Sequence, residues 1–294
     1  MPVPLHPDPR RASVRIRQLN AIFGLSAALL TFVVHANAET TLERIKRTGE
    51  IRIGYANESP FAFTKLDGTV TGESPEVARK VFAKMGVTKV DGVLTEWGSL
   101  IPGLRAGRFD VIASGTYIRP ARCPQVAFSE PIDKIEETVL TLPGNPKGIR
   151  SYADVVKNPD IKVAVASGSA DLSNAKEAGV GDAQLLQVAD APEQVQAVLT
   201  KRADAAASAN LTLREFADKY KGKVYVEPNF VDDPKHNGYS AFAFRPEDTD
   251  LRDNVNAILK TFIGSPEHLA TITPFNFNKQ NLPDKTTKEL CADK

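Results

Sequence analysis

The sequence is poor in the side chains that most catalytic and metal sites use. Its 294 residues include two cysteines, four histidines and one tryptophan. It contains no G-x-S-x-G, no H-E-x-x-H and no phosphate-binding loop. Two histidines, His236 and His268, lie beyond residue 38, and neither has a second ligand at metal spacing. We therefore expect no familiar catalytic constellation, no metal and no cofactor.

Long apolar runs are missing too, with one exception. The stretch "AIFGLSAALLTFVV" (21–34) follows four arginines and precedes "HANA" (35–38). It is shorter than the roughly 20 residues that a membrane-spanning helix needs. A basic, then apolar, then small-residue order is typical of a secretory signal peptide, here cut after Ala38. No cysteine follows the run, so we expect an exported chain without a lipid anchor, most simply in a bacterial periplasm.

The chain has no excess of charge of either sign. Removing residues 1–38 takes away four arginines and one aspartate, leaving 37 − 4 = 33 basic and 36 − 1 = 35 acidic residues, a formal charge of −2. This balance argues against a nucleic-acid partner, which favours a clustered basic face. The two cysteines, Cys123 and Cys291, are more typical of one disulfide than of a metal site in an exported protein.

What the chain does have is an alternation of strand and helix patterns. Ser74 is predicted to cap a helix with Pro75 at its first position, and Ser151 and Asp154 form a predicted capping box. Strands are predicted at 51–56, 89–95, 110–114, 162–167, 184–189, 204–208, 223–228 and 238–244. Helices are predicted at 41–50, 74–85, 99–107, 170–178, 191–202, 210–220 and 248–264.

Strands that alternate with helices of this length predict parallel sheets in an α/β fold. The Pro/Gly-rich stretch "TLPGNPKG" (141–148) predicts a boundary between two lobes. Ligands of such sheets lie at the carboxyl ends of strands and at helix N-termini, where backbone N–H groups favour anions.

Several stretches together resemble one family of transport proteins. They are "IRIGYANESPFAFTKLDGTVTGESPEVARKV", "WGSLIPGLRAGRFDVIASGTYIRPARCPQVAFSEP", "VAVASGS" and "AFAFRPEDTDLRDNVNAILKTF". In this order they resemble the polar-amino-acid-type (family 3) solute-binding proteins of bacterial ABC importers. Within that family, "YANESP", "TEWGSLIP", "NLPDKTTKELC" and the two cysteines resemble the binding proteins for ectoine and hydroxyectoine.

The resemblance implies a type II two-lobe clamshell in which each lobe is a sheet flanked by helices. It implies a monomer that closes on a small solute and delivers it to a membrane permease. It also implies that Cys123 pairs with Cys291 and ties down the C-terminal tail. The expected parts are lobe 1 at 39–140 and 245–294, lobe 2 at 145–238, and hinge strands near 139–143 and 240–244.

Two residues are expected to hold a carboxylate of the solute. Arg122 matches the arginine of the family's T-P-x-R motif, and a guanidinium can pair bidentately with a carboxylate. Ser169 follows a strand and precedes a helix, at the position where the family meets the same carboxylate. It can also cap that helix, and the two roles are compatible.

Four residues are expected at the cationic end of the solute. Phe61, Trp97 and Tyr117 match positions where the family lines its cleft with rings, which attract a diffuse cation. Core packing is the alternative for Phe61 or Trp97 alone. Glu58 either pairs with N–H groups of the same cation or is a solvated loop carboxylate.

The sequence departs from the family at two positions. Where many amino-acid binders carry an aspartate for the α-ammonium group, it has Ala209, followed by Asn210 as a further candidate ligand residue. Without that carboxylate, a delocalised or alkylated cation fits better than an ordinary α-amino acid. Arg119 replaces a threonine that would cap a helix beginning at Pro120, and it either adds positive charge to the cleft or points into solvent.

These observations predict a non-enzymatic binding protein for a small zwitterion, with ectoine or hydroxyectoine ahead of other polar amino acids, betaines and opine-like compounds. A cyclohexadienyl-dehydratase-like enzyme shares the expected fold and is a remote alternative, with Glu58 as general acid or base. A sensor ectodomain is disfavoured, because the sequence ends at Lys294 without a further apolar segment.

Overall fold

Two five-stranded sheets organise the chain, and they alternate along the sequence with the helices that cover them. The computed structural model describes residues 39–292, so the predicted signal peptide and its cleavage site lie outside the described residues. From Glu39 onward the chain forms one compact unit. The first sheet has the order β4 (Lys89–Leu94), β1 (Glu50–Tyr55), β5 (Val111–Ile112), β12 (Ala243–Phe244) and β6 (Ala127–Phe128). The second has the order β11 (Tyr225–Val226), β7 (Glu137–Thr141), β10 (Ala205–Ala209), β8 (Val163–Ala166) and β9 (Leu185–Val188).

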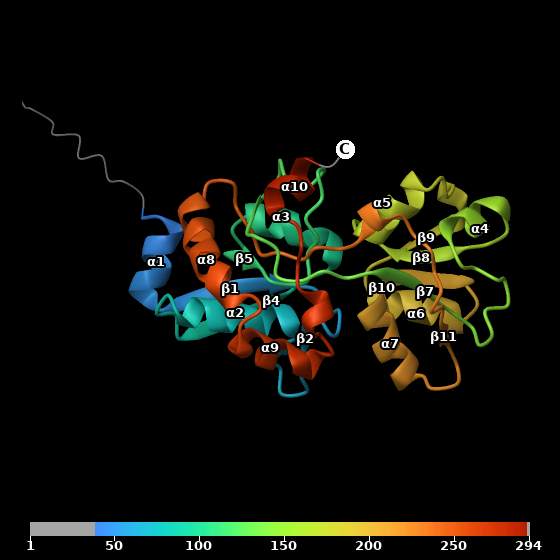
Figure 1. The fold of residues 1–294 in the computed structure, drawn as a ribbon, viewed down its shortest axis with the longest axis horizontal. Coiled ribbons are helices and arrows are strands. Elements are labelled where there is room, and N and C mark those ends of the chain that lie inside the picture. The colour runs from blue at the N-terminus through green and yellow to red at the C-terminus, as the bar shows by residue number, and fades with distance from the viewer. Residues whose placement is uncertain (1–38, 293–294) are drawn as a thin grey trace, which may run out of the picture. The chain divides into compact units, whose positions relative to one another are not determined.

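Helices pack on both faces of the first sheet (Figure 1). One apolar cluster joins strand residues such as Ile51 and Ile53 to helices α2 and α8, and another joins Ile112 to α3. Alternate residues of a strand point to opposite faces, which is why one sheet supports two cores. The helices on this side are α1 (Thr41–Thr48), α2 (Glu73–Ala83), α3 (Leu100–Arg105), α8 (Thr249–Phe262), α9 (Pro266–Ile272) and α10 (Thr287–Ala292), with 3₁₀ turns η1 (Trp97–Ser99), η4 (Thr273–Phe275) and η5 (Lys279–Asn281).

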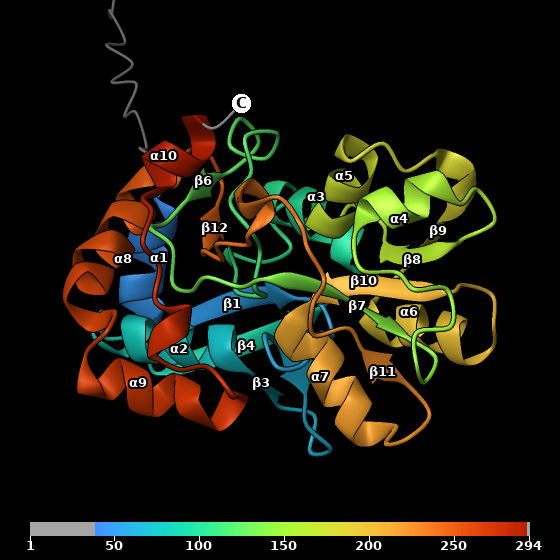
Figure 2. The same ribbon diagram turned by 45° about the vertical axis from the view of Figure 1, so that its right-hand side comes forward.

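The second sheet is covered in the same way, as Figure 2 shows with α4 and α5 on one side and α6 and α7 on the other. Val139 packs with residues of α4 and α5, whereas its neighbour Leu140 packs with residues of α6 and α7. The helices here are α4 (Tyr152–Lys157), α5 (Ala170–Glu177), α6 (Ala191–Leu199) and α7 (Asn210–Lys219), with 3₁₀ turns η2 (Asp182–Gln184) and η3 (Pro234–His236). A two-stranded hairpin, β2 (Phe63–Thr64) and β3 (Val70–Thr71), turns at Asp67-Gly68.

The chain crosses between the two sheets twice. It leaves the first sheet after β6 and enters the second at β7, and it returns between β11 and β12. The two crossing segments pair with each other at Ile135 and Gly238. Of the predicted hinge residues, 139–141 belong to β7 and 243–244 to β12. The lobe boundaries themselves stay a prediction.

The prediction of parallel sheets is only partly correct. β1 pairs in parallel with β4 and β5, and β8 with β9 and β10. The strands beside the crossings run the other way, because β7 pairs antiparallel with β10 and β12 pairs antiparallel with β5. A strand that enters a sheet from the other sheet has no βαβ crossover to impose a parallel direction.

The helix caps show which helix starts are set by local sequence and which are set by contacts with other segments. Ser151 caps α4, accepting a hydrogen bond from the Asp154 backbone N–H at 3.3 Å. The predicted capping box is not complete, because the Asp154 carboxylate accepts from the Arg150 backbone N–H and the Ser151 hydroxyl. The prediction for Ser74 is wrong, because α2 begins at Glu73 and Gly72 is its N-cap. The backbone N–H groups of Glu73 and Ser74 instead donate to Pro60 O and Phe61 O. The preceding loop therefore takes the place of a side-chain cap.

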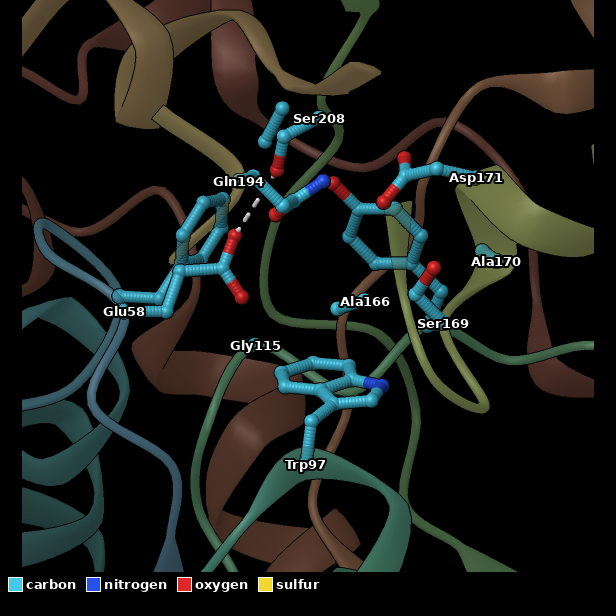
Figure 3. Close-up of a pocket in the computed structure, with 12 residues that line it drawn as sticks. Glu58, Trp97, Gly115, Ala166, Ser169, Ala170, Asp171, Gln194 and Ser208 are labelled. Carbon is cyan, nitrogen blue, oxygen red and sulfur yellow. Dashed lines mark hydrogen bonds between the residues drawn. The ribbon is translucent and has the colours of Figure 1, made fainter. Parts of the chain in front are cut away.

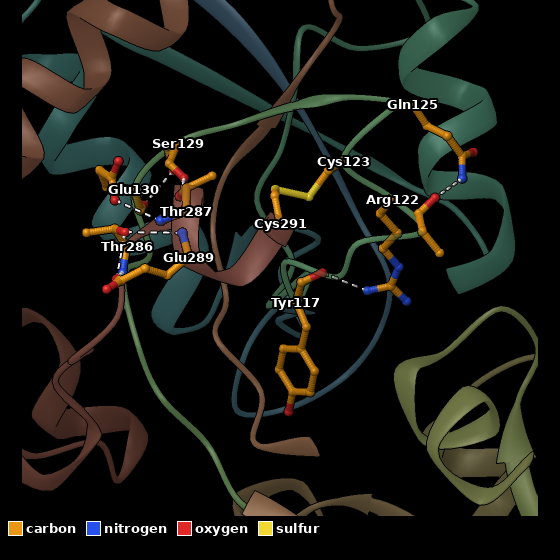
Figure 4. Close-up of a disulfide and its surroundings, with 11 residues drawn as sticks. Tyr117, Arg122, Cys123, Gln125, Ser129, Glu130, Thr286, Thr287, Glu289 and Cys291 are labelled. Atoms are coloured by element: carbon orange, nitrogen blue, oxygen red, sulfur yellow. Dashed lines mark hydrogen bonds between the residues drawn. A yellow bond between two sulfur atoms is a disulfide. The ribbon is translucent and has the colours of Figure 1, made fainter. Parts of the chain in front are cut away.

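The predicted disulfide joins Cys123 to Cys291, which lie 168 positions apart in sequence and have Cα atoms 5.9 Å apart (Figure 4). It fastens α10 to the segment that carries Arg122. Leu290 of α10 is buried in the cluster beneath α3, and the Thr287 backbone N–H donates to a Glu130 carboxylate oxygen at 3.0 Å. Within residues 39–292, no helix combines the length and apolar character needed to cross a membrane.

Candidate functional site

The ends of strands from both sheets meet at one small enclosed pocket. Its cavity volume is about 20 Å³, which holds about one water molecule. The lining residues are Glu58, Phe61, Trp97, Gly115, Tyr117, Ala166, Ser169, Ala170, Asp171, Gln194, Ser208 and Ala209.

The position of the pocket follows from the strand directions. On the first-sheet side, Glu58 and Phe61 lie in the loop after β1, Trp97 begins η1 just after β4, and Tyr117 follows β5. On the second-sheet side the lining comes from the ends of β8 and β10 and from the first turn of α5. Carboxyl ends of parallel strands and helix N-termini are the usual ligand positions of open α/β sheets.

The three predicted aromatic residues all line this pocket. Phe61 is 1% exposed and also packs edge-on against Phe277, with ring centroids 5.3 Å apart. Tyr117 is 7% exposed, and burial together with nearby carboxyl groups raises the pKa of its phenol well above the usual value. Trp97 is half-buried, and Figure 3 shows its indole forming one wall. Core packing and pocket lining therefore coincide for Phe61.

Glu58 reaches from the first-sheet side to groups of the second sheet. The hydroxyls of Ser208 and Thr212 both donate to its Oε1, each at 3.2 Å. Burial raises the pKa of the Glu58 carboxyl to about 7, and the charge of Asp171 adds to that shift. The interpretation of Glu58 as a solvated loop carboxylate is therefore wrong.

Ser169 and Asp171 bring the start of α5 to the pocket. Ser169 is 5% exposed and caps α5, with the Leu172 backbone N–H donating to its Oγ at 3.1 Å. Asp171 is 7% exposed, and burial raises the pKa of its carboxyl to about 6. A polar residue in the first turn of a capped helix is the signal from which sequence reasoning could have found Asp171.

Arg122 lies beside the pocket and not in its lining. Its guanidinium donates to Tyr117 O at 2.9 Å, as Figure 4 shows. It also donates to Gly168 O at 2.9 Å, and so joins the two sides next to Ser169. Burial and the charge of Arg119 lower its pKa to about 10, so it stays cationic at neutral pH. It also lines a neighbouring open groove of about 1100 Å³.

Arg119 neither enters the pocket nor points into solvent. Its guanidinium donates to three backbone carbonyls of the second crossing segment, those of Lys235, His236 and Asn237. It also lies 3.9 Å from Glu137 Oε1. The predicted helix at Pro120 is absent, because residues 120–125 form only turns.

Asn210 is not brought to this pocket. It begins α7 and lines a separate cavity beside Glu136 and Arg214, whereas its neighbour Ala209 lines the pocket. Sequence reasoning missed Gln194 and Ser208. Gln194 Nε2 donates to carbonyls of β8 and β10 and anchors α6 against both strand ends. Within residues 39–292 no group of three or more potential metal ligands is arranged around a metal site.

Comparison with known proteins identifies the family. The sequence profile of the bacterial extracellular solute-binding proteins, family 3, matches residues 51–273. This chain belongs to that family. A probable amino-acid ABC transporter periplasmic-binding protein of Sinorhizobium fredii, y4tE, is 36% identical over 292 residues, covering 96% of both chains. Proteins of this family bind small ligands and deliver them to an ABC permease.

Solved structures agree with the family and with the fold. The structure of EhuB in complex with hydroxyectoine has a TM-score of 0.82 and 35% identity, and covers 87% of this chain and 99% of EhuB. An ancestral amino-acid-binding protein described as a precursor of cyclohexadienyl dehydratase has a TM-score of 0.70 and 30% identity, over 80% of this chain and 99% of its own. The fold is therefore the predicted α/β arrangement of sheets flanked by helices, typical of type II periplasmic binding proteins.

Proposed function

We propose that this protein is the periplasmic receptor of an ABC importer for ectoine or hydroxyectoine. The observation that carries the proposal is the convergence of Glu58, Phe61, Trp97 and Tyr117 on one pocket, beside a cationic Arg122. Ectoine is a small zwitterion with a delocalised ring cation and one carboxylate. The site offers matching groups for both ends.

The cationic end of the solute would lie among the three rings with its N–H groups toward Glu58. Each ring face attracts a cation by about 0.5–2 kcal/mol. Ala209, 3% exposed in the lining, provides no carboxylate at the position where many amino-acid binders hold the α-ammonium group. A cation spread over a ring uses the aromatic surface better than a compact ammonium group does.

The carboxylate end would lie between Arg122 and Ser169. The Arg122 guanidinium already donates to the carbonyl of Gly168, the residue before Ser169, so the two groups are neighbours. Both of its present acceptors are neutral carbonyl oxygens, and a carboxylate forms stronger, charge-assisted hydrogen bonds with a guanidinium. Exchange of one acceptor for the solute would accompany binding.

Similarity supports the same solute. The structure with a TM-score of 0.82 is a hydroxyectoine complex, and it spans nearly the whole of EhuB. The signal-peptide pattern before Glu39 supports a periplasmic location, as does the periplasmic relative in Sinorhizobium fredii.

Isothermal titration calorimetry of the mature chain, residues 39–294, tests the proposal. The protein is unfolded and refolded first, to remove any solute that it carries. The titrants are ectoine, hydroxyectoine, glycine betaine, glutamine, histidine and lysine. We expect binding of ectoine or hydroxyectoine at least 100-fold tighter than of the three α-amino acids, about 2.7 kcal/mol. Tight binding of an α-amino acid with no response to ectoine would overturn the proposal and leave the family unaffected.

A further inference from the structure

We propose that Asp171 is a second carboxylate for the cation of the solute, so that the pocket selects cations with N–H donors on two sides over quaternary ammonium ions. This inference rests on the proposed function and deepens it. The second carboxylate would distinguish amidinium solutes such as ectoine from betaines. The aromatic rings alone would accept both kinds of cation equally well.

The position of Asp171 supports this role. It lies in the first turn of α5, is 7% exposed and lines the same pocket as Glu58. Its buried Oδ1 has no hydrogen-bond partner among residues 39–292. Figure 3 shows the Glu58 and Asp171 carboxyl groups on opposite sides of the pocket, with the Trp97 indole below both in that view. One carboxyl comes from each sheet.

Neither carboxyl has a cationic partner. Within the described part of the chain, no ion pair involves Glu58 or Asp171. The guanidinium groups of Arg119 and Arg122 influence Asp171, but both donate their hydrogen bonds to backbone carbonyls and none to Asp171. Buried carboxylates without a counter-charge are unfavourable. A cation between the two would relieve both, so the ligand itself is the missing partner.

Glu137 is a further buried carboxyl group that interacts with Asp171. The two carboxyl groups interact, and the Asn174 side-chain N–H donates to Glu137 Oε1 at 2.6 Å. Burial and the charge of Asp171 raise the pKa of Glu137 well above its usual value. Glu137 and Asp171 therefore interact, whereas Oδ1 of Asp171 has no hydrogen-bond partner among residues 39–292 and is left for a ligand.

The geometry of the cation then decides which solutes fit. An amidinium ion is planar and carries N–H groups on two nitrogens, one for Glu58 and one for Asp171. A trimethylammonium group has no N–H, so it would leave both carboxylates without hydrogen bonds. Sites built to hydrogen-bond a ligand reject analogues that lack the matching group far more strongly than apolar pockets do.

Calorimetric titration of ectoine and glycine betaine into wild type, Asp171→Asn and Asp171→Glu tests the inference. Asp182→Asn is the control, because Asp182 lies in the same part of the chain with its side chain 83% exposed. We expect Asp171→Asn to weaken ectoine binding at least tenfold and to leave glycine betaine within threefold. Asp171→Glu should recover part of the ectoine affinity, and Asp182→Asn should match wild type.

Two results would overturn the inference alone: ectoine binding by Asp171→Asn within twofold of wild type, or equal affinity of wild type for ectoine and glycine betaine. The second needs no variant, so the test stands even if Asp171→Asn does not fold. If wild type binds no ectoine at all, the proposed function fails and this inference fails with it.

Discussion

Arg122 is the residue on which the carboxylate half of the site depends. Its guanidinium contacts carbonyls on both sides of the pocket and stays charged despite burial. We expect Arg122→Ala to weaken ectoine binding by at least 100-fold, because the solute carboxylate loses its charge-assisted partner. The melting temperature of the ligand-free protein should change little, since both lost hydrogen bonds join neutral carbonyls to one side chain.

Calorimetry and a thermal melt of the same sample check this prediction. Arg105→Ala, in the last turn of α3 and exposed, is the control and should bind as wild type does. A folded Arg122→Ala variant with wild-type affinity would remove Arg122 from the site.

Glu58 makes the stability of the ligand-free protein depend on pH. Burial raises its pKa from 4.5 to about 7, so its contribution to stability is fully present below pH 4.5 and is lost as pH rises through 7. Glu58→Gln is neutral throughout and lacks this loss. The melting temperature of Glu58→Gln minus that of wild type should therefore be about 5–10 °C more positive at pH 8 than at pH 5. Melting curves that shift in parallel at both pH values would contradict the assignment.

At the residue scale, the sequence predicted the pocket residues of the first-sheet side better than those of the second-sheet side. Glu58, Phe61, Trp97, Tyr117 and Ser169 were predicted and line one pocket. They follow strand ends or begin a helix, so local pattern and resemblance together place them. Ser208 and Asp171 were missed, because their role depends on which strand end (β10) and which helix start (α5) face residues more than 100 positions away in sequence.

At the scale of elements, the second crossing segment passes so close to the Tyr117 ring that its backbone fixes one wall of the pocket. A Cβ atom at Gly238 would lie 2.2 Å from the Tyr117 ring, so glycine is required where the second crossing segment passes that ring. We expect Gly238→Ala to displace Tyr117, weaken ectoine binding at least tenfold and destabilise the fold by about 1–3 kcal/mol.

Gly181→Ala is the matched control, because a Cβ there would meet nothing closer than 3.8 Å. Calorimetry and denaturant unfolding of both variants provide the measurement. Wild-type affinity in Gly238→Ala would mean that the position of the Tyr117 ring does not matter for binding.

The start of a helix was predictable where a capping side chain sets it, and was not predictable where contacts from other parts of the chain take the place of that cap. Ser151 and Ser169 cap α4 and α5 as their sequences suggest. Ser74 does not cap α2, because carbonyls of the preceding loop receive the first N–H groups. Pro120 begins only turns, and Arg119, which lacks a capping acceptor, binds the second crossing segment instead.

At the scale of the whole molecule, the disulfide holds the C-terminal helix against the segment that carries Arg122. It closes a loop of 168 positions, so its loss should destabilise the fold by about 2–5 kcal/mol. The double variant Cys123→Ser/Cys291→Ser should show that loss in denaturant unfolding and still bind ectoine when folded. Oxidised wild-type protein that unfolds at the same denaturant concentration as the variant would contradict this expectation.

We propose that the two sides of the pocket move apart to admit the solute and close around it. In this conformation Glu58 bonds Ser208, Arg122 bonds Gly168, and the cavity holds only about one water molecule. We propose that the paired crossing segments around Ile135 and Gly238 are the hinge. The sequence placed the hinge near these segments by resemblance, but the pairing of the two segments depends on contacts far apart in sequence.

A crystal structure of the mature chain grown with ectoine tests the central claim most directly. We expect the solute carboxylate within hydrogen-bonding distance of Arg122 and Ser169, and its ring among Phe61, Trp97 and Tyr117 with N–H groups toward Glu58. Ectoine bound elsewhere, or bound in this pocket with its carboxylate away from Arg122, would contradict the account.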